Sequence, residues 1–118
     1  MLMITALIQP FRLDHVRSEL LSADLVGLTI SYCFGHGRQP QFVPSLTGGP
    51  DVPDILPKVK IEIAVPSDKR DEAIAAIIRG TRLGKIFVSQ LDRVISVRTG
   101  FENEDALQSS DWPAEAAE

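Results

Sequence analysis

The 118-residue sequence predicts one α+β domain with a ferredoxin-like βαββαβ sandwich. The length suits a single domain, since domains typically have about 100 to 200 residues. Apolar residues alternate with other residues along 1–9 and 59–65, as in strands with one buried face. Two further segments carry their apolar residues at helical spacing. These patterns occur in the order that the sandwich requires.

The first third of the chain predicts a strand, a helix and a second strand. The strand over 1–9 ends at Pro10, and its apolar face consists of Leu2, Ile4, Ala6 and Ile8. A helix begins at Leu13 and the unit closes at Gly27; its apolar stripe consists of Leu13, Val16, Leu20 and Leu21. Residues 28–33 are β-branched enough to form the next strand.

Residues 35–56 have no apolar period and predict a loop. They contain four glycines and four prolines: Gly35, Gly37, Gly48, Gly49, Pro40, Pro44, Pro50 and Pro53. A structureless segment of that length in so small a domain is typical of a functional loop.

The second half repeats the strand and helix pattern. Residues 59–65 give the clearest strand signal in the chain. Ser67 is placed to cap a helix over 68–79. The apolar stripe of that helix consists of Ala73, Ile74, Ile77 and Ile78.

Gly80 and Gly84 then bracket a predicted turn, followed by strands over 85–90 and 93–98. Two helices cover one face of such a sheet and leave the other face bare. The bare face would carry Met3, Thr5, Leu7, Lys60, Glu62 and Ala64. Because these residues are partly apolar, we expect neighbouring subunits to cover them.

Charge divides the chain into a domain over 1–100 and an acidic tail over 101–118. The tail holds six acidic residues and no lysine or arginine, which leaves 12 basic and 10 acidic residues in the domain. A mildly cationic domain suits a small anionic ligand better than nucleic acid. The tail, with Trp112 and Pro113, is either disordered or docks on the protein or a partner.

Apolar runs are too short to span a membrane and no signal peptide is apparent, so we expect a cytoplasmic protein without membrane insertion. Cys33 is the only cysteine and lacks a catalytic motif, and the histidines His15 and His36 are too few for a metal centre. The sequence therefore predicts neither an enzyme nor a metal site.

One motif, residues 35–39, could bind an anion. It consists of Gly35, His36, Gly37, Arg38 and Gln39, and joins a pliable backbone to a guanidinium that can hold phosphate. Further candidates are the cations Arg82, Lys85 and Arg98, and an anion nest formed by the backbone of 80–84.

With this motif, the runs 6–20, 54–66 and 84–100 make the sequence resemble the PII signal-transduction family over residues 1–100. The resemblance implies a homotrimer that binds adenine nucleotides in three clefts between subunits and signals through a T-loop, here 35–56. It implicates Gly35, Gly37, Arg38 and Gln39 at the loop base, Glu62 and Ala64 on one strand, and Gly27, Thr29 and Arg98 from the adjoining subunit. Thr29 would then contact the adenine, Glu62 the ribose and the cations the phosphates.

The sequence also departs from the family pattern. About five residues are missing from the phosphate-binding loop between Thr81 and Phe87, Lys85 is the candidate for its lysine, and Ser96 replaces a usual arginine. We therefore expect ADP or AMP to bind better than ATP, and 2-oxoglutarate to bind weakly. A small anion such as bicarbonate could bind at Gln39 and Lys58.

The loop has Asp51 in place of the family's modified tyrosine, so we expect no nucleotidylylation. The resemblance to PII-like proteins with altered loops implies that the T-loop binds a protein target, either a transporter or an enzyme of carbon metabolism. It also implies a role in inorganic-carbon metabolism, with an association with the carboxysome. Two alternatives stay open: a CutA-like metal-binding or structural trimer, and an acylphosphatase-type enzyme with its phosphate cradle at Arg38.

Overall fold

The computed structural model describes residues 1–37 and 54–108. The strands are β1 (Leu2–Ile8), β2 (Thr29–Gly37), β3 (Asp54–Val65) and β4 (Lys85–Gln90). The helices are α1 (Leu13–Ser22), α2 (Arg70–Thr81) and α3 (Glu104–Gln108), and short 3₁₀ helices at Pro10–Arg12 and Ser67–Lys69 precede α1 and α2. The predicted βαββαβ order is thus confirmed.

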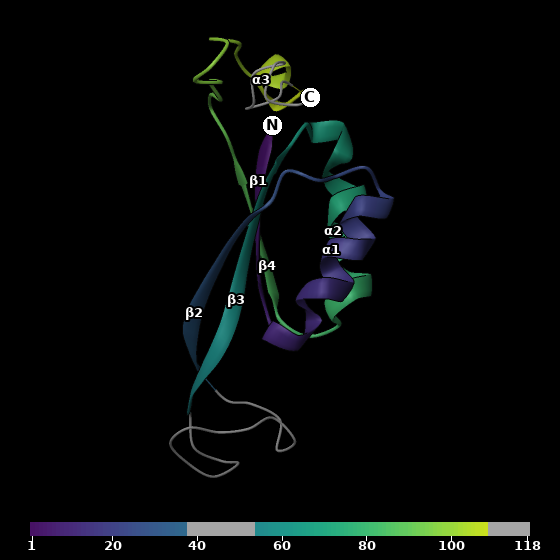
Figure 1. Cartoon of the computed structure of the whole chain (residues 1–118), viewed down its shortest axis with the longest axis vertical. Coiled ribbons are helices and arrows are strands. Elements are labelled where there is room, and N and C mark those ends of the chain that lie inside the picture. Colours follow the sequence, from purple (N-terminus) through teal and green to yellow (C-terminus); the bar gives the residue numbers. More distant parts are fainter. Residues whose placement is uncertain (38–53, 109–118) are drawn as a thin grey trace, which may run out of the picture.

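The four strands form one antiparallel sheet in the order β2-β3-β1-β4. Both long helices, α1 and α2, lie on the same side of this sheet (Figure 1). This strand order and the single helical layer confirm the ferredoxin-like sandwich.

The core lies between the sheet and the two helices. Burial alternates strictly along β1, and the same alternation runs through β3 from Val59 to Val65. In the register Ile4 lies opposite Ile63, and Ala6 lies opposite Ile61, so the buried faces of the two central strands coincide. The buried core consists of Leu2, Ile4, Ala6, Ile8, Val16, Leu20, Val59, Ile61, Ile63, Val65, Ala73, Ala76 and Ile77.

Helix α2 packs tightly against α1 at Gly80, and here the sequence prediction was wrong. Gly80 does not lie in a turn; it lies buried near the end of α2. A Cβ added to Gly80 would lie 2.6 Å from the Cα of Val16 on α1. Close helix contact, rather than turn geometry, explains this glycine. An ion pair from Arg79 to Glu19, 2.9 Å long, joins the same helices.

Strands β2 and β3 extend further than predicted, so the predicted loop over 35–56 is wrong at both ends. The ladder continues beyond Cys33 and Lys58 until Gly37 pairs with Asp54. Residues 38–53, the remainder of that loop, lie outside the described residues.

The predicted cap at Ser67 was also wrong. Ser67 begins a 3₁₀ helix, and no side chain caps α2. The Ser67 hydroxyl instead accepts a hydrogen bond from the amino group of Met1, at 3.1 Å.

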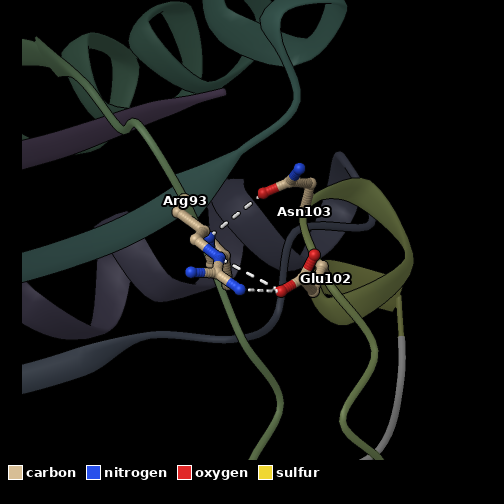
Figure 2. A network of polar contacts seen from close by, with 4 residues as sticks. Arg93, Glu102 and Asn103 are labelled. Carbon is tan, nitrogen blue, oxygen red and sulfur yellow. Dashed lines mark hydrogen bonds and ion pairs between the residues drawn. The ribbon is translucent and has the colours of Figure 1, made fainter.

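Residues 93–98 do not form the predicted strand, because the chain folds back on itself there. Only Ile95 makes a β-bridge, to Glu102, and the backbone N–H of Ser96 donates to the Phe101 carbonyl. Figure 2 shows how side chains fasten the fold-back: Arg93 contacts Glu102, and Asn103 accepts from the Val94 N–H at 3.2 Å. The helix α3 follows within the segment predicted as a tail.

We predict that Gly80→Ala destabilises the protein by about 1–3 kcal/mol, because the added methyl group overpacks the contact with α1. Urea unfolding followed by circular dichroism measures this. Gly27→Ala is the matched control, since a Cβ at Gly27 meets nothing within 4 Å. Equal unfolding midpoints for the two variants would contradict the packing argument.

Candidate functional site

The sheet face opposite the helices carries a row of polar and aromatic side chains across all four strands. The register aligns Thr29 with Glu62, Glu62 with Thr5, and Thr5 with Phe87. Thr5 and Glu62 are half-buried, whereas Thr29 is exposed and Phe87 is 51% exposed. The prediction that no helix of the same chain covers this face is therefore confirmed for the described residues. The face carries the Phe87 ring and the Glu62 carboxylate on one surface.

A neighbouring row brings two lysines to the same face. It aligns Ser31 with Lys60, Lys60 with Leu7, and Leu7 with Lys85. Lys60 contacts Glu62 at 4.0 Å, a weak ion pair between partly exposed groups. Lys85, predicted as the phosphate lysine, thus faces the same side of the sheet as Glu62.

The base of the β2–β3 hairpin holds the predicted glycines. Gly35 pairs with Leu56 and Gly37 with Asp54, while His36 is exposed. A Cβ on Gly35 would lie 3.0 Å from the Cγ of Lys58, so the stem of Lys58 lies across the Gly35 backbone. This contact brings Lys58 to the predicted binding loop. Arg38 and Gln39 lie outside the described residues.

The turn between α2 and β4 has only three residues, Arg82, Leu83 and Gly84. The Thr81 hydroxyl donates to the Leu83 carbonyl at 2.6 Å, and Arg82 adopts a left-handed conformation with φ of 62°. Gly80 and Thr81 belong to α2, so of the predicted anion nest over 80–84 only residues 82–84 lie in the turn; anion binding there stays a prediction. The backbone available for a phosphate is confined to this short turn.

Gly27 and Ala64 lie together at the other end of the sheet. They line a cavity of about 640 Å³ between the end of β3, residues 24–27, residues 94–96 and α3. Ser96 also lines it and is 6% exposed. Arg98 is exposed in the turn that follows Ser96.

The candidate residues of one chain therefore form two separate groups. Gly35 lies six positions after Thr29 on β2, which is about 20 Å along a strand. Lys85 lies opposite Leu7, near one end of β1, whereas Arg98 follows β4 beyond the other end, where Gln90 pairs with Leu2. The structure brings Glu62 and Lys85 onto one face, but it does not bring Arg98 to the hairpin base.

Sequence reasoning did not place Phe87 on this face, and it placed Lys60 there without naming it as a candidate site residue. The signal was available, because alternation from Lys85 places Phe87 on the same face, and alternation from Glu62 does the same for Lys60. In residues 1–37 and 54–108, no three metal-ligating side chains cluster to form a metal site. None of the helices in those ranges has the length and apolar character that crossing a membrane requires.

The sequence was compared with known protein families and with curated proteins, and both comparisons match one family. The model of the family described as nitrogen regulatory protein P-II matches residues 1–101. The chain is 43% identical over 109 residues to the nitrogen regulatory protein P-II of Haemophilus influenzae, an alignment that covers 88% of this chain and 97% of that protein. It is 42% identical, with the same coverage, to the P-II of Pasteurella multocida and to P-II 1 of Escherichia coli K12.

We predict that Arg82→Gly stabilises the protein by about 0.5–1 kcal/mol, because glycine adopts the left-handed conformation without the Cβ clash. Arg82→Ala is the control: it removes the same charge but keeps the strain, so its stability should stay near that of the unmodified chain. Urea unfolding midpoints decide, and equal midpoints for the two variants would mean that the turn is unstrained.

Proposed function

This chain belongs to the nitrogen regulatory protein P-II family of signalling proteins, and from that membership we propose that it is a homotrimer that binds adenine nucleotides between its subunits. Nucleotide occupancy would set the conformation of the T-loop, which regulates a protein target. ADP and AMP are the favoured ligands, and ATP binds more weakly.

The observation that carries the nucleotide preference is the three-residue turn between α2 and β4. A turn this short offers few backbone N–H donors, and Ser96 stands where the family usually has an arginine. Each lost charge-assisted hydrogen bond weakens binding by about 1.5–3 kcal/mol. The outermost phosphate of ATP would lose most, since it lies furthest from the adenine.

The separation of the candidate residues supports a site shared between copies. Gly35 and Lys85 lie toward one end of the sheet, and Gly27 and Arg98 lie toward the other. The two groups of a single chain are separated by about 20 Å of strand. One nucleotide therefore cannot place its adenine and its phosphates against both groups of the same chain in the way proposed. A second subunit that supplies Gly27, Thr29 and Arg98 solves this geometric problem.

A small anion such as bicarbonate is the proposed second ligand, with Lys58 beside Gly35 as the described part of its site. Gln39, its predicted partner, lies outside the described residues. The target would be a transporter or an enzyme of carbon metabolism, and sensing of bicarbonate would link it with the carboxysome. This role in inorganic-carbon metabolism is the finer part of the proposal.

We predict that calorimetric titration gives tighter binding of ADP and AMP than of ATP, and that Lys85→Met weakens ADP binding about 10- to 100-fold through loss of one charge-assisted contact. Arg70→Met is the control, because Arg70 begins α2 and is paired with the neighbouring Asp71. ATP binding more tightly than ADP, or an Arg70→Met effect equal to that of Lys85→Met, would contradict the proposed phosphate site.

We predict that bicarbonate changes the affinity for ADP in the unmodified protein and has no effect in Lys58→Met, because the variant lacks the cation beside Gly35. Calorimetry with and without bicarbonate measures this, with chloride at equal ionic strength as the control. If ADP binds but bicarbonate leaves its affinity unchanged, the inorganic-carbon role fails and the nucleotide site stands.

A further inference from the structure

A groove unrelated to the bare sheet face lies on the helical layer. It has a volume of about 390 Å³ and runs between α1 and the segment that leads into β2. Its lining consists of Asp14, Arg17, Ser18, Leu21, Leu25, Val26 and Leu28. A groove of this size accommodates a large side chain.

Two apolar side chains in this groove are unusually open to solvent. Leu21 is 63% exposed and Val26 is 67% exposed, and they line the same hollow. On the rim, Arg17 contacts Asp14 at 3.4 Å, with its side chain 57% exposed. The groove therefore combines an apolar floor with an accessible guanidinium.

The C-terminal end of the described chain lines a cavity that shares a wall with this groove. Leu25 and Val26 line both the groove and the cavity under α3, and Gln108, the last described residue, lines that same cavity. Trp112 follows four residues later. Four residues span at most about 14 Å. The wall that separates the cavity from the groove is formed by Leu25 and Val26, which line both.

We propose that Trp112 of the same chain occupies the groove between α1 and residues 24–28. Residues 109–118 contain one large apolar side chain, three acidic residues and no basic residue. The indole ring would cover Leu21 and Val26, and the Arg17 guanidinium can lie over its face or pair with Asp111.

The covalent link favours this occupant over a separate peptide. A segment tethered at Gln108 is present near the groove at high effective concentration, so even weak apolar contact holds it there. The inference goes beyond the proposed function, because it requires no nucleotide and no partner protein.

Fluorescence of the full-length protein without nucleotide tests the proposal, because Trp112 is the only tryptophan. We expect blue-shifted emission that is protected from acrylamide. Leu21→Asp and Val26→Asp should each move the emission to that of solvent-exposed indole. Val97→Asp is the matched control, at a position that is 98% exposed and outside the groove, and it should leave the spectrum unchanged.

Solvent-exposed emission in the unmodified protein would overturn the proposal. Blue-shifted emission that survives in both groove variants would also overturn it, since Trp112 would then be buried elsewhere. Nuclear Overhauser contacts from the indole to the Leu21 and Val26 methyl groups test the same placement in the unmodified chain, so the outcome does not depend on the variants folding. Absence of those contacts counts against it.

Discussion

Among residues 1–37 and 54–108, two long helices cover one face of the sheet and leave its other face open, and the rest of the structure depends on this uneven cover. Helices α1 and α2 cover one face at its two central strands, where Ile4 of β1 and Ile61 of β3 are fully buried. The other face keeps Met3, Leu7 and Phe87 partly open beside Lys60 and Glu62. A face of this composition is too apolar for free solvent and too charged for a core, which is typical of a surface shared with other copies around a polar ligand.

The fold was predictable where the alternation of apolar residues in a strand agrees with the pairing of that strand in the sheet. Alternation over 59–65 fixed the face on which Glu62 lies, and the pairing of β1 with β3 kept that assignment. The sequence prediction failed where pairing overrides propensity. Residues 34–37 and 54–57 include glycine and proline, yet they extend the hairpin because their backbones hydrogen-bond each other. Residues 93–98 alternate well but form no sheet strand, because residues 101–103 take their hydrogen bonds.

The candidate site shows the same division. The sequence identified Lys85 as a candidate cation, but its place on the bare face comes from its pairing with Leu7. Gly80 was misread as a turn residue, because a contact between two helices cannot be seen in the pattern of one helix alone. Lys58 reaches the hairpin base by lying across Gly35, a contact between strands that only the register reveals. The shortened connection before Lys85 was visible in the sequence, and the structure gives it a definite form, a three-residue turn with a left-handed Arg82.

We propose that copies of this chain meet at the bare sheet face and share nucleotide sites there. Native mass spectrometry in the presence of ADP tests it most directly. We expect a species of three times the 12.9 kDa chain mass that carries up to three ADP molecules. A species of single-chain mass at micromolar concentration, or a trimer that takes up no ADP, would contradict it.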